Sequence, residues 1–210
     1  MTLLRFADSK EAADLAAFLG RLLRYDKRAA VRIQAHGQAL GPPPFGGLAV
    51  RTARLAARAA EKPPLDVTVS AGQFLDGFDE AAATATVPPT VTGPPWAGPL
   101  PPRGGWHRTA ALPAEAVRRE VAQGIAEFRA RSEELTPEQR TRTELDRIAD
   151  EIWSRPLALA GAPSVPLRAA HAAHALGFLQ SPRRRGGPER PGAGTGDRIV
   201  VLSNGGWLRM

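Results

Sequence analysis

Hydrophobic positions in the first third of the chain alternate between helical and strand periods. Between Asp8 and Tyr25 the large apolar residues recur at i, i+3, i+4, i+7 and i+8, which is one face of a helix: Leu15, Phe18, Leu19, Leu22 and Leu23. Asp8, with Glu11 three residues later, has the pattern of a capping box. The sequence therefore predicts a helix that ends near Tyr25.

Alternating apolar and polar residues predict short strands around this helix, at residues 2–6, 30–35, 48–55 and 65–69. Ser70 and Gln73 form a second capping box and predict a second helix. That helix would bury Phe74, Leu75 and Phe78. The order β-α-β-β-β-α predicts an α+β domain over residues 1–86, with an antiparallel sheet covered by helices on one face.

A proline-rich stretch, residues 87–112, separates this domain from the rest of the chain. Proline fixes φ and has no amide donor, so the stretch cannot form a helix or a central strand. A flexible linker would be rich in glycine and serine, whereas this one contains Trp96 and Trp106. Leaving two indoles in water is costly, so we expect an ordered structural strap with both rings buried against the neighbouring halves.

Three helical patterns and a hairpin signal follow the strap. The first helix begins at Leu112-Pro113 and has an apolar stripe of Val117, Val121, Ile125 and Phe128. Gly124 lies beside this stripe and could let another element approach closely. The second helix is predicted to start at Thr136-Pro137-Glu138-Gln139, and the third follows Val165.

Asn204-Gly205 lies between two apolar runs, which is a strong signal for a β-hairpin. Residues 113–210 are therefore predicted to be a helical domain with a terminal hairpin. Within it, residues 181–196 are rich in Arg, Gly and Pro and lack apolar residues, so we expect a flexible loop there.

Composition narrows the class of protein. Of the 210 residues, 43% are hydrophobic and 23% are charged, which is typical of a globular protein. The chain contains no cysteine, which excludes disulfides and thiol catalysis and favours a reducing cytoplasm. No apolar run approaches the roughly 20 residues that a membrane span requires, and no secretory signal is visible.

Positive charge is concentrated near the C-terminal end. The net charge is +7, and five of these charges fall after Arg155, where seven arginines face two acidic residues. A basic segment of this kind can bind nucleic acid or can be a solvated loop. The abundance of Arg, Ala, Gly and Pro would also follow from GC-rich codon usage.

Candidate catalytic and metal-binding residues are few. His171 and His174 are spaced to lie on one helical face and are weak candidates for metal ligands, with Glu144 or Asp150 as a possible third ligand. Packed or half-exposed histidines are the more common outcome of such a pattern. No nucleophile, zinc or phosphate-loop motif occurs, so the sequence favours a protein without enzymatic activity or cofactor.

Three helices followed by a hairpin resemble the winged-helix arrangement of DNA-binding proteins, by element order alone. The resemblance implies that the helix after Val165 would enter a DNA groove. It also implies nucleic-acid contacts from Arg168, Arg183, Arg184, Arg185 and Arg198. The long turn before that helix departs from the arrangement.

The Ala/Arg/Pro-rich composition with paired tryptophans also resembles conserved uncharacterised proteins of GC-rich actinobacteria, a resemblance that implies no activity. The function that we expect is that of a cytoplasmic, two-domain, non-enzymatic interaction protein. Its partner would be another protein or a second copy of the chain. DNA binding through the C-terminal half is the alternative.

Overall fold

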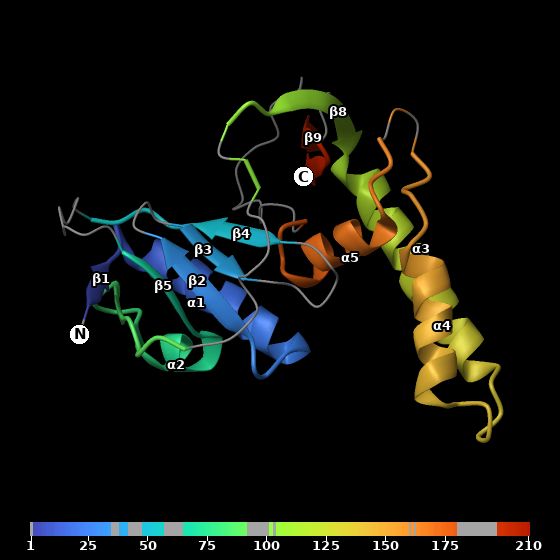
Figure 1. Ribbon diagram of the computed structural model, residues 1–210, viewed down its shortest axis with the longest axis horizontal. Helices are drawn as coiled ribbons and strands as arrows, with labels where there is room; N and C mark the ends of the chain where they lie inside the picture. Colours follow the sequence, from blue (N-terminus) through green and yellow to red (C-terminus); the bar gives the residue numbers. More distant parts are fainter. Residues whose placement is uncertain are drawn as a thin grey trace, which may run out of the picture. The chain divides into compact units, whose positions relative to one another are not determined.

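The chain forms two compact units, Met1–Pro99 and Leu100–Met210. The computed structural model describes residues 2–34, 48–56, 65–91, 101–102, 104–159, 161, 163–179 and 197–210, together with the backbone of 38–41. Each unit combines strands with helices, which confirms the predicted α+β class (Figure 1).

The first unit holds seven strands and two helices among its described residues. They are β1 (Leu3–Arg5), α1 (Ser9–Tyr25), β2 (Ala30–Gln34), β3 (Gln38–Gly41), β4 (Ala49–Thr52), β5 (Asp66–Ser70), α2 (Ala71–Asp76), β6 (Phe78–Asp79) and β7 (Thr84–Thr86). The predicted helix end at Tyr25 is confirmed. Strands β6 and β7 were not predicted, because runs of two and three residues are too short to show a period.

The strands of the first unit form two antiparallel sheets, where the sequence analysis expected one. One sheet has the order β4-β3-β2-β5, and the other has the order β1-β7-β6. The first strand pairs with β7, some eighty residues away in sequence, and no local pattern indicates such a pairing. Two isolated bridges connect the sheets. One pairs Phe6 with Leu55, and the other pairs Val69 with Thr90, just after β7.

Helix α1 supplies much of the core of the first unit. The Asp8 carboxylate accepts the amide of Glu11 at 2.8 Å, as in a capping box. The side chain of Glu11 bonds to Arg54 at 2.8 Å instead of returning to the cap. The buried residues of α1 are Ala12, Leu15, Ala16, Phe18, Leu19 and Leu22. The predicted apolar stripe is therefore the face that packs inward.

Helix α2 is shorter than its predicted apolar face. Its buried aromatic residue is Phe74, while Leu75 is half-buried. Phe78 lies beyond the helix on β6, where its ring stacks on Phe6 and meets Phe74 edge to face. The aromatic cluster thus joins α2 to the smaller sheet.

The second unit contains β8 (His107–Pro113), α3 (Ala114–Glu133), α4 (Arg142–Trp153), α5 (Leu167–Ala175), β9 (Arg198–Asn204) and β10 (Trp207–Arg209). Its strands form one antiparallel sheet with β9 in the centre, in the order β10-β9-β8. Helices α3 and α4 lie side by side (Figure 1). The core between helices and sheet is formed by residues such as Leu112, Val121, Ile152 and Val201.

The end of the predicted strap belongs to this sheet. Residues 107–113 form β8 and pair with β9, so the last part of the 87–112 stretch is a strand of the second unit. Residues 92–100, with Trp96, and Arg103 lie outside the described part of the chain, as do residues 180–196 with the predicted loop. Strand β8 was missed because its first residues are exposed and polar and its partner lies ninety residues later.

Helix α4 begins five residues after the predicted start, at Arg142 instead of Pro137. The capping hydrogen bonds of the Thr136 box do form, with the Gln139 amide 3.4 Å from the Thr136 hydroxyl, but they close only a turn. Thr141 caps α4 instead, accepting the amide of Glu144 at 3.3 Å. The buried residues of α4, Ile148 and Ile152, lie in the helix that this second cap starts.

The terminal hairpin is present, and its turn lies one residue further on than expected. Asn204 pairs with Trp207, so the loop residues are Gly205 and Gly206. Only Gly205 has a positive φ, at 54°. A positive φ at the first of two loop residues is the requirement of a type II′ turn.

The second unit departs from the winged-helix arrangement. Its first strand precedes all three helices and pairs with β9, which makes a three-stranded sheet out of the predicted two-stranded wing. The connection between α4 and α5 folds back on itself, with the Leu157 amide 2.8 Å from the Val165 carbonyl. A helix-turn-helix has a tight turn at this position.

Candidate functional site

The exposed side of the β8–β9–β10 sheet gathers arginines and apolar residues. Along β9, Val201 is buried and Ile199 packs against the core, so the residues between and beyond them face away from the helices. Directly paired residues of antiparallel strands share a face, which carries this face onto β8 and β10. We call it the outer sheet face, and its members are Arg108, Arg198, Val200, Leu202, Trp207 and Arg209.

The register fixes the arrangement of these residues. Arg108 on β8 and Arg209 on β10 both lie opposite Leu202, so two guanidiniums flank one apolar side chain. Trp207 lies opposite Asn204 at the hairpin end of the face, and Val200 is 40% exposed nearer the other end. All three arginines are exposed, while Leu202 and Trp207 are half-buried.

None of these three arginines has a carboxylate partner among the described residues. Arg198 donates through Nη2 to the backbone carbonyl of Ala111, and no ion pair of the described residues includes Arg108, Arg198 or Arg209. The outer sheet face therefore presents positive charge that the described part of the fold does not neutralise.

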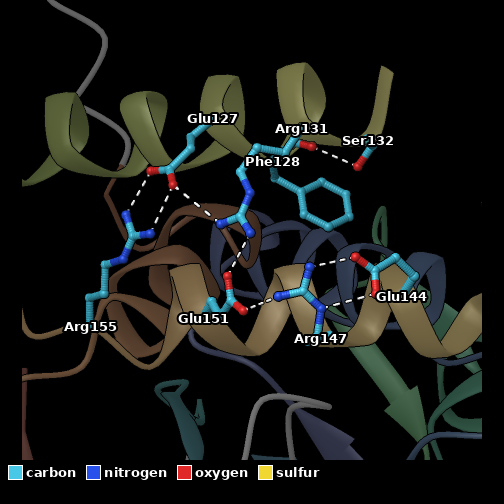
Figure 2. A network of polar contacts seen from close by, with 8 residues as sticks. All are labelled: Glu127, Phe128, Arg131, Ser132, Glu144, Arg147, Glu151 and Arg155. Atoms are coloured by element: carbon cyan, nitrogen blue, oxygen red, sulfur yellow. Dashed lines mark hydrogen bonds and ion pairs between the residues drawn. The ribbon is translucent and has the colours of Figure 1, made fainter. Parts of the chain in front are cut away.

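The arginines between α3 and α4 provide the contrast (Figure 2). Arg155 binds Glu127 through two hydrogen bonds, at 2.7 and 2.8 Å. Arg131 reaches Glu151 on the facing helix at 2.5 Å. Arg147 contacts both Glu144 and Glu151 on its own helix. Three carboxylates and three guanidiniums balance one another in this α3–α4 network, so it holds the helices together and leaves no free charge for a ligand.

The network shifts the pKa of each of its carboxylates downward. The hydrogen bond from Arg155 lowers the pKa of Glu127, that from Arg147 lowers the pKa of Glu144, and that from Arg131 lowers the pKa of Glu151. The same contacts raise the pKa of Arg147 and of Arg155. The three carboxylates are therefore charged at neutral pH.

The two edges of the sheet are poorly suited to pairing with another strand. Strand β10 has only three residues and carries Arg209. Strand β8 is longer, but its register shifts between Arg108 and Ala110, which marks a bulge at Thr109. Short edge strands, charged residues and bulges all oppose edge-to-edge pairing. A partner of this sheet would therefore lie on the outer sheet face.

The arginines proposed to contact nucleic acid do not gather at one place in the described structure. Arg198 lies on the outer sheet face. Arg168 lies on α5, is half-buried, and donates to the Ser154 hydroxyl at 2.5 Å. Arg183, Arg184 and Arg185 lie outside the described residues.

Helix α5, the helix that would enter a groove, is a core helix. Leu167 and Ala170 belong to the core, and Ala169 and Ala173 pack against it. His171 stacks on Trp153, with ring centroids 4.3 Å apart and planes within 8°. Base readout needs an exposed polar face, and in α5 the one residue classed as exposed is His174.

The two histidines lie in different environments. His171 is half-buried, and burial, with a smaller effect of His174, lowers its pKa below 6.5. His174 is exposed. Among the described residues no three His, Asp or Glu side chains come together as a metal site would require, and neither Glu144 nor Asp150 completes one with this pair.

Trp106 is half-buried, and its indole N–H donates to the carbonyl of Pro102 at 2.9 Å. Gly104 and Gly105, which precede Trp106, lie against Asn204. The side-chain amide of Asn204 donates to the Gly104 carbonyl at 2.7 Å. The described end of the strap is therefore attached to the β9–β10 hairpin. Burial of both indoles against the two halves stays a prediction.

Sequence reasoning missed most of the outer sheet face. Arg108 falls within the predicted strap, and Val200, Leu202 and Trp207 lie in the apolar runs that predict the hairpin. The apolar run from Ile199 to Leu202 indicates a strand, but which of its sides faces outward depends on the pairing with β8. Because that pairing is non-local, no sequence window contains it.

The two units define an α+β protein of two domains, and the comparisons with known families divide the chain in nearly the same way. The chain belongs to the family of domains of unknown function DUF8185, which matches residues 101–210. Residues 1–98 match a second domain of unknown function, DUF8010. No curated protein and no solved structure matches the chain. No helix in the described part of the chain is long and apolar enough to span a membrane.

Proposed function

We propose that this chain is a cytoplasmic, non-enzymatic interaction protein that binds a protein partner through the outer sheet face of its second unit. The observation that carries the proposal is the group of Arg108, Arg198 and Arg209, which are exposed beside Val200, Leu202 and Trp207 and have no carboxylate partner in the part of the chain that the structure describes. The lack of cysteine throughout the sequence agrees with a reducing compartment. We also propose that the chain is a protein of the actinobacterial type that its composition resembles.

The composition of the outer sheet face supports binding. Tryptophan and arginine are the residues most enriched at energetic centres of protein interfaces. Aromatic residues and arginine are also over-represented at interfaces relative to the rest of the surface. Val200, on the same face as the arginines and Trp207, is 40% exposed. A partner that covers the face would therefore remove apolar area from water.

The chemistry of the same face supports a non-enzymatic role. Its ionisable groups are guanidiniums, which offer N–H donors and no acceptor for a proton. Guanidiniums bind and orient carboxylates or phosphates instead. A flat sheet face with such groups is suited to recognition.

A capture experiment tests this proposal. Immobilised wild-type chain and a Val200→Asp variant are exposed to cell extract, and the bound proteins are quantified by mass spectrometry. The variant is expected to lose a partner that the wild type retains, because a carboxylate at the centre of the face both neutralises an arginine and disrupts apolar contact. Ala126→Asp on the exposed side of α3 is the matched control and should retain it. Equal capture by all three proteins would contradict the proposal.

Nucleic acid is the second candidate partner, and one observation favours it. Trp207 lies on the same face as the three arginines, and a positively charged surface with an aromatic ring is also how single strands are bound. A DNA-binding titration in salt tests it. Binding at about 50 mM salt should weaken steeply as salt rises, and replacing the three arginines by alanine should flatten that slope. No binding at about 50 mM salt would exclude this candidate.

A further inference from the structure

We infer that the occupant of the outer sheet face is an acidic segment of a partner protein, with carboxylates placed on either side of an apolar side chain. This inference rests on the proposed function and specifies the partner. It follows from the charge of the face, from the spacing fixed by the strand register, and from the blunted edges of the sheet.

Charge selects the kind of partner. Arg108, Arg198 and Arg209 are exposed and have no carboxylate partner among the described residues, so they attract negative charge. Two copies of the chain meeting through this face would bring six guanidiniums together, and like charges facing one another across an interface are costly. A second copy is therefore disfavoured, and a partner with Asp or Glu residues is favoured.

The register defines the spacing that the partner must match. Arg108 and Arg209 lie on the two strands that flank β9, both opposite Leu202, so their Cα atoms are about 10 Å apart, or two inter-strand spacings. An extended segment advances about 3.3 Å per residue, so two acidic residues about three positions apart would reach both arginines. A side chain between them would contact Leu202.

The apolar members of the face favour a peptide over a nucleic acid. Val200 and Leu202 form the centre of the face between the arginines, and these side chains are aliphatic, whereas the bases of a single strand stack on aromatic rings. A peptide can pair its carboxylates with the arginines through charge-assisted hydrogen bonds and bury an apolar side chain against β9. It would cross the strands on the face, because the bulge on β8 and the short β10 oppose extension of the sheet.

Selection from a random peptide library displayed on phage tests the inference, with the full chain as bait. The enriched peptides should carry at least two Asp or Glu residues around an apolar residue. A synthetic peptide from the selection is then titrated by fluorescence anisotropy. Replacing its acidic residues by Asn or Gln, or using the Arg108→Ala/Arg209→Ala variant, should each weaken binding about tenfold or more, the loss expected for charge-assisted contacts.

A matched variant controls for net charge. Arg119→Ala/Arg129→Ala removes two exposed arginines from α3 and should leave the affinity unchanged. No enriched peptide, enrichment of neutral or basic peptides, or equal losses in both double variants would overturn the inference. So would DNA binding or dimerisation that depends on Arg108 and Arg209 in place of peptide binding.

The same variants separate this inference from the proposed function. If Val200→Asp abolishes capture of a partner whose binding does not depend on carboxylates, the outer sheet face is an interface and the acidic segment is wrong. If Val200→Asp changes no capture, the proposed function itself fails.

Discussion

At the scale of single residues, one small side chain determines how closely the helices of the second unit approach. A Cβ on Gly124 would lie 2.9 Å from Cζ3 of Trp153 and 3.0 Å from Cδ2 of Leu167, so α4 and α5 both pack where a larger residue would stand. The indole cannot easily move away, because His171 stacks on it. The prediction that Gly124 lets another element approach closely is therefore confirmed.

Replacing Gly124 by alanine should therefore destabilise the second unit. Alanine is the better helix former by about 1 kcal/mol, but overpacking a tight contact costs about 1–3 kcal/mol, so we expect a net loss of up to about 2 kcal/mol. Denaturant unfolding followed by tryptophan fluorescence measures the change. Gly20→Ala in α1 is the matched control, since nothing lies within 4 Å of its Cβ, and it should stabilise by up to about 1 kcal/mol. Stabilisation by both substitutions would contradict the close packing.

His171 should make the stability of the second unit depend on pH. Burial lowers its pKa below 6.5, so the folded state binds fewer protons than the unfolded state in the window below 6.5. The contribution of neutral His171 to the free energy of unfolding is complete above pH 6.5 and is lost as the pH falls from 6.5 to the lowered pKa. Unfolding in urea at pH 7.5, 6.5 and 5.5 measures the slope, and His171→Phe should flatten it while keeping an aromatic ring against Trp153. An unchanged slope would mean that other groups cause it.

At the scale of elements, local signals start helices and turns, and packing decides where they end up. The Thr136 box makes its capping hydrogen bonds but only a turn, whereas Thr141 caps the helix whose residues Ile148 and Ile152 reach the core. The α3–α4 network then joins two helices whose apolar faces already meet (Figure 2). The β9–β10 turn depends on Gly205, whose φ of 54° disfavours other residues.

Acid should weaken the α3–α4 helix pair in a window distinct from that of His171. The pKa values of Glu127, Glu144 and Glu151 are lowered, so their contribution is complete above the ordinary value of 4.5 and is lost as the pH falls through the lowered values. We expect a second fall in the denaturation midpoint below pH 4.5. The Glu127→Gln/Glu151→Gln double variant should show a smaller fall in the midpoint, and added salt should make the fall smaller as well. If the double variant keeps the whole acid transition, other carboxylates are responsible.

Two neighbouring glycines allow a direct test of the hairpin turn. Gly205→Ala should cost about 1–2 kcal/mol, the usual penalty of a left-handed backbone for a residue with a side chain. Gly206→Ala should cost less than about 0.5 kcal/mol, because its φ is not positive. Neither Cβ meets any atom within 4 Å, so the difference isolates backbone conformation. Thermal unfolding compares the variants, and equal midpoints would show that the turn has a different geometry.

At the scale of the whole molecule, the chain is two folding units with separate cores. The boundary of the compact units, between Pro99 and Leu100, agrees with the boundary between the two matched domain families. The core of the second unit is made of residues from 112 onward, and its sheet is complete from residue 107. The two units therefore each have the core that independent folding requires.

A fragment of residues 101–210 should fold without the first unit. We expect cooperative urea unfolding and the same loss on Gly124→Ala as in the full chain, because every contact of Gly124 lies within the fragment. Circular dichroism follows both transitions. A fragment that unfolds without cooperativity, or in which Gly124→Ala has no effect, would show that the second unit depends on the first.

The sequence by itself determined the features that depend on neighbours within a few residues. The periodicity of Leu15, Phe18 and Leu22 predicts α1 with its end near Tyr25, and the order of patterns predicts the α+β class. Helix periodicity and glycine conformation are local, so a window of the sequence contains their cause.

Only the tertiary structure decided which strands pair and which residues share a face. The pairing of β1 with β7 and of β8 with β9 joins segments eighty to ninety residues apart, and it creates the smaller sheet and the outer sheet face. A one-residue change of register would move Arg108 and Arg209 away from Leu202 and to the opposite side of the sheet. The candidate site is therefore a property of long-range pairing, which no local pattern specifies.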